Sequence, residues 1–160
     1  MRKTKLSAAM EMPDGVMLFG DPDYRGECPA EDSDLISFVA WLKYNWPELE
    51  SCIIHTPNEG GLPVQARMQQ KKKGVLFRCP DIIVMTVPAF CMELKRRNPA
   101  KSLARAEDRK RFSEQVDVLA SMQKQGNFSC AALGLDAAKE SWKYFLAWRD
   151  GVCNSLVVDK

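Results

Sequence analysis

Apolar residues recur at helical spacing in three segments of the chain. The first segment, residues 31–45, carries Leu35, Phe38, Val39 and Leu42 on one stripe, and Pro47 ends it. Similar stripes predict a helix over residues 104–125 and another after residue 136. These two stripes consist of Phe112, Val116, Leu119 and Met122, and of Trp142, Phe145 and Leu146. The three helices are amphipathic, so each one has a face to bury against another layer.

Four short apolar runs predict strands, at residues 51–55, 81–86, 90–95 and 128–133. Pro88 separates the second run from the third and favours a hairpin there. Residues 1–30 are rich in Pro, Gly and Asp and predict an irregular arm, whereas residues 62–74 predict a basic helix or a mobile loop, and residues 98–102 a basic loop. The order helix, three strands, helix, strand, helix predicts an α/β domain over residues 31–150. A small mixed four-stranded sheet would be flanked by helices, and a tail would follow at residues 151–160.

Composition restricts the class of protein. The 160 residues are 46% hydrophobic and 28% charged, as in an ordinary soluble domain. No apolar stretch approaches the roughly 20 residues of a membrane span, and no signal-peptide core follows the basic N-terminus. The six cysteines are scattered without a CxxC pair, which favours reduced thiols in a cytoplasmic protein.

Charge is segregated along the chain. Residues 1–66 carry a net charge of −6, residues 67–111 carry +9, and residues 112–160 carry −1. A run of this kind is either a solvated face or a surface for a polyanion, and the carboxylates inside it favour the polyanion. The candidate nucleic-acid contacts in this segment are Arg67, Lys71, Lys72, Lys73, Arg78, Arg96, Arg97 and Lys101.

Three charged residues in the predicted hairpin suggest chemistry. Alternation along residues 90–95 puts Cys91, Glu93 and Lys95 on one face. If the hairpin turns around Pro88, Asp81 lies opposite Lys95 and diagonal to Glu93. Two neighbouring carboxylates repel each other unless a cation lies between them, and Mg²⁺ prefers one or two carboxylates with water and phosphate oxygens. The alternative is an ordinary strand pair with exposed charges.

Further candidates come from neighbouring elements. Glu31 falls on the inward stripe of the first helix, where it is either part of the site or a favourable first-turn charge. Gln115 lies beside the inward stripe of the long helix and needs a polar partner there. Asn58 and Glu59 form either an active-site loop or a plain turn, and His55 is either a proton carrier or a locally bonded strand-end residue.

These motifs, in this order, resemble the VRR-NUC domain (virus-type replication-repair nuclease) of the PD-(D/E)xK nuclease superfamily. The resemblance covers residues 31–147. It rests on Glu31, Asn58-Glu59-Gly60, Pro80-Asp81, Glu93-Leu94-Lys95, and Ser113-Glu114-Gln115 followed by Leu119, Met122 and Gly126. It implies a restriction-endonuclease-like core.

The resemblance also implies metal-dependent cleavage of DNA. Asp81 and Glu93 would bind Mg²⁺ or Mn²⁺, and Glu31 would complete or support that site. Lys95 would activate water and stabilise the transition state, while Gln115 would contact the site or the DNA backbone. Stand-alone members are small phage or bacterial proteins, some of them homodimers that act on branched DNA such as Holliday junctions. The alternative among enzymes is a nicking or flap nuclease in phage replication or packaging.

The chain departs from the family pattern at two places. Phe77-Arg78-Cys79 stands where a glycine-rich approach to Pro-Asp is common, and Leu35 stands where a glutamine is common. The competing hypothesis is a non-catalytic protein that keeps the nuclease fold to bind DNA or to inhibit a host defence or recombination enzyme. The complete set of Asp81, Glu93 and Lys95 favours the enzyme.

Overall fold

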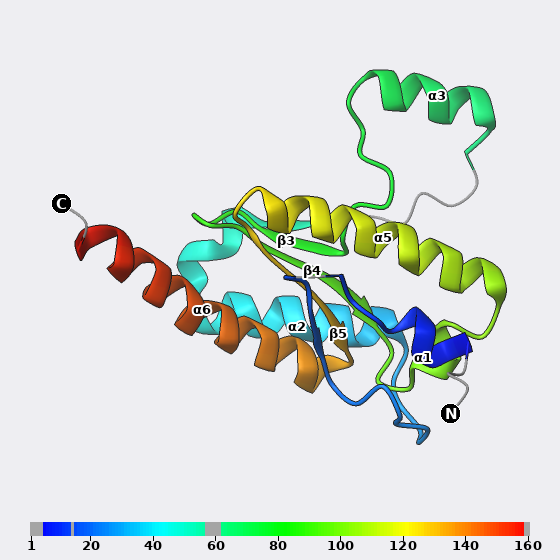
Figure 1. Ribbon diagram of the computed structural model, residues 1–160, viewed down its shortest axis with the longest axis horizontal. Helices are drawn as coiled ribbons and strands as arrows, with labels where there is room; N and C mark the ends of the chain where they lie inside the picture. The colour runs from blue at the N-terminus through cyan, green and yellow to red at the C-terminus, as the bar shows by residue number, and fades with distance from the viewer. Residues whose placement is uncertain (1–4, 14, 57–61, 159–160) are drawn as a thin grey trace.

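The computed structural model describes residues 5–13, 15–56 and 62–158, with the backbone alone described over residues 152–158. One mixed sheet lies between two layers of helices (Figure 1). The strands are β1 (Met17–Phe19), β2 (Ile53–His55), β3 (Ile82–Val84), β4 (Phe90–Lys95) and β5 (Phe128–Leu133). The helices are α1 (Lys5–Ala9), α2 (Glu31–Asn45), the 3₁₀ helix η1 (Pro47–Cys52), α3 (Val64–Lys72), α4 (Pro99–Ser102), α5 (Ala106–Lys124) and α6 (Leu135–Val158).

The strand order across the sheet is β1-β5-β4-β3-β2. β3 pairs antiparallel with β2 and with β4, so β3 and β4 form the predicted hairpin. β5 runs parallel to β4 after the crossover through α5, and β1 runs parallel to β5 at the other edge. All six residues of β4 and of β5 are buried, as expected for central strands with both faces covered.

Alternate residues of β4 enter different cores. Phe90, Met92 and Leu94 point to the layer formed by α2 and α6, where the ring centroid of Phe90 lies 5.1 Å from that of Trp142. Cys91 points to the opposite layer and packs with Leu119 of α5. The side chains at positions 93 and 95 therefore also face α5, although both are charged.

The fold confirms the mixed α/β prediction and corrects two details. The sheet has five strands, because the three residues of β1 in the predicted irregular arm pair with β5. Residues 151–158 of the predicted tail also belong to α6, which continues to Val158. Gly151 does not end the helix, since glycine weakens a helix by only about 1 kcal/mol and keeps its N–H donor.

α3 lies apart from the sheet, on the side of α5 (Figure 1). It has no buried residue and has Lys71 and Lys72 in its last turn, so it is the basic helix anticipated from the sequence. Within the described residues, no helix combines the length and the apolarity that crossing a bilayer requires. The cysteines at positions 28, 52, 91 and 130 are free thiols.

Candidate active site

The structure brings Asp81, Glu93 and Lys95 together where β3 begins beside β4. Ile82 pairs with Met92, so continuing the antiparallel register places Asp81 directly opposite Glu93. The predicted pairing of Asp81 with Lys95 was wrong by two residues. Paired residues of the two strands lie symmetrically about Val87, because the loop between the strands comprises residues 85–89. The prediction assumed a turn centred on Pro88. A shift of two residues leaves each side chain on the same face, so the charged face survives the error.

Asp81 is held by its backbone and by its carboxylate. The Leu94 N–H donates to Asp81 Oδ2 at 2.9 Å, so the carboxylate replaces a backbone acceptor of the sheet. His55 Nδ1 lies 2.9 Å from the carbonyl oxygen of Asp81, and the Thr56 hydroxyl donates to the carbonyl of Pro80 at 2.6 Å. His55 is thus hydrogen-bonded to the backbone of the neighbouring strand, and Asp81 is fixed in position.

Lys95 lies between two carboxylates. Its ammonium donates to Glu93 Oε1 and, at 3.2 Å, to the carbonyl oxygen of Leu94. Glu31 Oε1 lies 3.6 Å from Lys95 Nζ, and the ring centroid of Phe112 lies 5.7 Å from it. The start of α2, β4 and α5 therefore converge on one ammonium group.

Glu31 is oriented by residues that the sequence did not single out. The Ser102 hydroxyl donates to Glu31 Oε2 at 3.3 Å and accepts from the Arg96 N–H at 3.2 Å. Ser102 ends α4, and Asn98 caps the start of this helix, where its side chain accepts from the Ala100 N–H at 3.1 Å. The sequence Asn98-Pro99 is a helix-start signal, so a short helix could have been predicted here in place of the loop.

Burial dominates the electrostatics of the site. Glu93 is completely buried, and burial raises the pKa of its carboxyl from 4.5 to about 8. Burial also raises the pKa of Glu31, although Lys95 opposes that shift. For Lys95 burial favours the neutral amine, but Glu93, Glu31 and Asp81 outweigh it and raise the pKa of the ammonium above its ordinary value. Lys95 therefore stays charged.

A divalent cation would balance the charge of the fully ionised cluster. With Glu31, Asp81 and Glu93 all ionised beside Lys95 the net charge would be −2, whereas burial keeps the proton on Glu93 up to a pH of about 8 in the metal-free protein. Among the described residues, Glu93 Oε2 and Gln115 Oε1 are buried and have no hydrogen-bond partner. Across the described residues, no group of three or more His, Cys, Asp and Glu side chains is arranged to hold a metal. The arrangement fits Mg²⁺ held by Asp81 and Glu93 with water and substrate oxygens, while Glu31 contacts Lys95.

An open pocket of about 320 Å³ gives access to this cluster. Gln115 of α5 lines it, as the inward stripe of that helix predicts. Its remaining lining is mostly charged and includes Arg111 and Asp108, which sequence reasoning did not assign to the site. The full lining consists of Glu31, Lys95, Arg96, Lys101, Ser102, Asp108, Arg111 and Gln115.

The eight basic residues predicted to contact nucleic acid lie in different surroundings. Arg96 and Lys101 line the pocket beside Lys95, and Lys101 also pairs with Glu27 at 2.7 Å. Arg97 instead covers the ring of Tyr24, with its guanidinium carbon 4.3 Å from the ring centroid.

The other five basic residues lie on and after α3. Three of them line a second pocket: Arg67, Lys71 and Arg78. Lys72 and Lys73 are exposed at the C-terminal end of α3. The candidate loop residues Asn58 and Glu59 lie outside the described part of the chain.

One of the comparisons with known proteins supports the fold. A solved structure described as a "VRR_NUC domain protein" superposes with a TM-score of 0.56 at 19% sequence identity. The match covers 76% of this chain and 91% of the other chain, so the two proteins share a fold. No family model matches the sequence, and no curated protein matches it.

Proposed function

We propose that this protein is a metal-dependent endonuclease that hydrolyses phosphodiester bonds of DNA. The observation that carries the proposal is the buried cluster of Asp81, Glu93 and Lys95, in which Glu93 Oε2 has no partner among the described residues and Lys95 lines a basic pocket. A buried set of charges is costly for a protein that only binds, because each unpaired acid must be desolvated. The VRR_NUC neighbour supports the same conclusion through its fold.

Each residue of the site has its own role in the proposed reaction. Mg²⁺ or Mn²⁺ bound by Asp81 and Glu93 would polarise the phosphoryl oxygen and lower the pKa of attacking water. Lys95, which stays protonated, donates to the oxygen on which negative charge develops. Glu31 holds that ammonium in place at 3.6 Å, and Gln115 orients a water molecule or a phosphate oxygen through its free amide oxygen or its NH₂ group.

Positive charge at the pocket rim would fix the substrate without reading its sequence. Arg96, Lys101 and Arg111 surround the entrance and suit the phosphates that flank the cleaved bond. Cleavage is therefore expected to depend on DNA structure more than on base sequence, with flaps and four-way junctions as the proposed substrates.

The test is an incubation of wild-type protein with Mg²⁺ or Mn²⁺ and linear, flapped and four-way DNA, beside Asp81→Ala and Lys95→Ala. The wild type should cut, chelation by EDTA should stop it, and both variants should lose at least about a hundredfold in rate. Lys143→Ala is the matched control, because Lys143 is exposed on α6 away from the pocket. A wild type that cuts none of the substrates, or variants that cut as well as the wild type, would contradict the proposal.

A homodimer would let two such sites cut both strands of a junction. An apolar surface that could carry the interface lies on α2 and at the edge strand β2, where Ile36 is 70% exposed, Tyr44 86% and Ile54 44%. A cavity of about 610 Å³ lies on the same surface. Sedimentation at high concentration tests this proposal: a species of 18.1 kDa alone would rule out the paired cut.

A further inference from the structure

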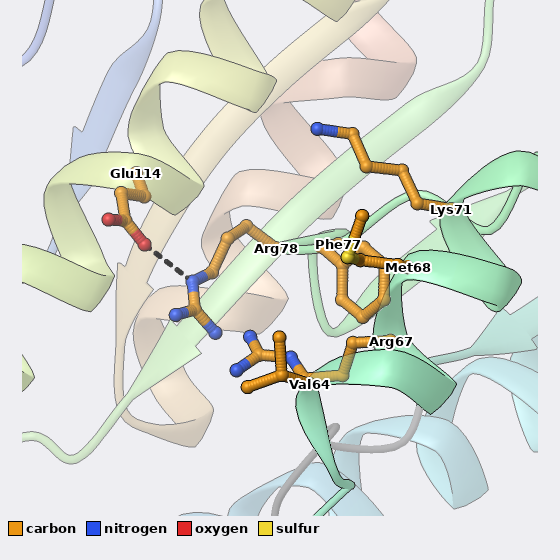
Figure 2. Close-up of a pocket in the computed structure, with 7 residues that line it drawn as sticks. All are labelled: Val64, Arg67, Met68, Lys71, Phe77, Arg78 and Glu114. Atoms are coloured by element: carbon orange, nitrogen blue, oxygen red, sulfur yellow. Dashed lines mark hydrogen bonds and ion pairs between the residues drawn. The ribbon is translucent and has the colours of Figure 1, made fainter.

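A second pocket, of about 380 Å³, lies between α3 and α5. Its volume is within the range of roughly 300–1,000 Å³ that is typical of sites for small ligands. Val64, Arg67, Met68 and Lys71 enter it from α3, Phe77 and Arg78 from the loop that follows, and Glu114 from α5 (Figure 2). None of these residues belongs to the cluster around Lys95.

One side of this pocket is apolar although α3 is strongly basic. Val64 is 72% exposed and Met68 is 59% exposed, so neither side chain stabilises the core. Phe77 is half-buried beside them, with the guanidinium carbon of Arg67 5.5 Å from its ring centroid. Paired bases in duplex DNA keep their faces stacked inside the helix. An unpaired base offers an apolar face that suits such a lining.

The other side of the pocket is cationic. Arg67, Lys71 and Arg78 face one acid, Glu114, so the lining carries a net charge of +2. Arg78 donates from Nε to Glu114 Oε2 at 2.6 Å, and this hydrogen bond lowers the pKa of Glu114. Arg78 has a φ of +64°, a conformation unusual for a residue other than glycine. The backbone is thus strained at the residue whose side chain spans the pocket toward α5 (Figure 2).

The two pockets are neighbours along the chain. Arg78 precedes Asp81 by three residues, which is at most about 10 Å of extended chain. Glu114 of this pocket is followed on α5 by Gln115, which lines the pocket around Lys95. This spacing is short enough for one strand to reach both pockets within a few nucleotides.

From these contacts we propose that the pocket between α3 and α5 binds an unpaired nucleotide of the strand that is cleaved. Its base packs against Val64, Met68 and Phe77, and its phosphate binds Arg78 and Arg67. This subsite rests on the proposed nuclease function and adds the substrate class: DNA with a single-stranded segment next to the cut. The phosphate and the carboxylate of Glu114 compete for Arg78, so the ion pair opens when the strand binds.

The test is a binding measurement on the full-length protein in EDTA, where no cleavage occurs. Three fluorescent probes of equal length separate the contacts: oligo(dT), an abasic deoxyribose-phosphate strand and a duplex. Phe77→Ala should weaken oligo(dT) binding by about tenfold, within the range that base stacking contributes, and leave the abasic strand unaffected. Met85→Ser, at an exposed apolar residue in the loop between β3 and β4, is the control and should bind like the wild type.

Glu114 and the phosphate compete for Arg78, so removing the charge of Glu114 should change the affinity in the opposite direction. Glu114→Gln should bind oligo(dT) several-fold more tightly, because Arg78 is no longer held by a carboxylate. Glu140→Gln removes the same charge from an exposed position on α6 and should change nothing. Met68→Ser repeats the Phe77 test at an exposed position whose substitution does not disturb folding.

The inference is overturned if Phe77→Ala and Met68→Ser bind oligo(dT) as tightly as the wild type. It is also overturned if the abasic strand binds as well as oligo(dT), or if only the duplex binds. Because no metal is present, a protein that binds in this way but never cuts refutes the proposed function and leaves the subsite intact. A protein that cuts, with an unchanged KM for flapped DNA in Phe77→Ala, refutes the subsite alone.

Discussion

The raised pKa of Glu93 predicts that the metal-free protein loses stability as the pH rises. In the folded protein this carboxyl keeps its proton up to a pH of about 8, whereas in the unfolded chain it releases the proton near 4.5. Between these values the folded state binds more protons than the unfolded state, so the free energy of unfolding falls with increasing pH. Between pH 5.5 and pH 8.0, the titration of Glu93 lowers the free energy of unfolding by about 3 kcal/mol.

Glu93→Gln isolates the effect because it removes the titrating group and keeps the shape of the side chain. Urea unfolding in EDTA at several values between pH 5.5 and 8.0 should show the loss in the wild type and a much flatter profile in the variant. For a chain of this length, 3 kcal/mol corresponds to roughly 6–12 °C in Tm. Mg²⁺ should restore most of the loss at pH 8.0 in the wild type and little in Glu93→Gln.

Parallel profiles for the two proteins would refute this reasoning, because they would mean that Glu93 titrates alike in the folded and unfolded states. A wild-type stability that rises over the same pH range, with no such rise in Glu93→Gln, would refute it equally.

Three further predictions follow from packing and contacts. Phe38→Ala, in the core under the sheet, should lower the free energy of unfolding by about 3–5 kcal/mol in urea titrations, and a loss below 1 kcal/mol would contradict the packing. Gly134→Ala should lower Tm measurably, because φ is +86° and a Cβ would lie 2.9 Å from Arg97 Cβ; an unchanged Tm would contradict that geometry. Glu31→Gln should slow cleavage by about tenfold, less than Asp81→Ala, and an equal loss in single-turnover assays would make Glu31 a metal ligand rather than a support.

The pattern of apolar residues was sufficient to predict the elements with strong periodicity. α2 and the central strands β4 and β5 have the predicted bounds, because each carries several apolar residues at one clear period. β1 was missed because the short apolar run between Gly15 and Gly20 carries no period of its own and becomes a strand only through pairing with β5. Local sequence does not contain that partner.

The candidate site was likewise predicted only in part from the sequence. The alternation of side chains along the strands was enough to place Asp81, Glu93 and Lys95 on one face of the sheet. The register of the two strands depended on the conformation of the loop between them. The contact from Ser102 to Glu31 joins residues 71 positions apart, so only the tertiary fold reveals it. The glycine-poor approach to Pro-Asp proved informative, since Arg78 adopts a positive φ at that place.

The most direct test of the account is the single-turnover rate of DNA cleavage by wild type and Lys95→Gln at saturating Mn²⁺. The substitution keeps a polar side chain of similar length and removes only the charge that faces three carboxylates. The account predicts metal-dependent cleavage by the wild type and a loss of about 10²–10³-fold in the variant, with DNA binding retained. Equal rates for the two proteins, or cleavage that persists in EDTA, would contradict it.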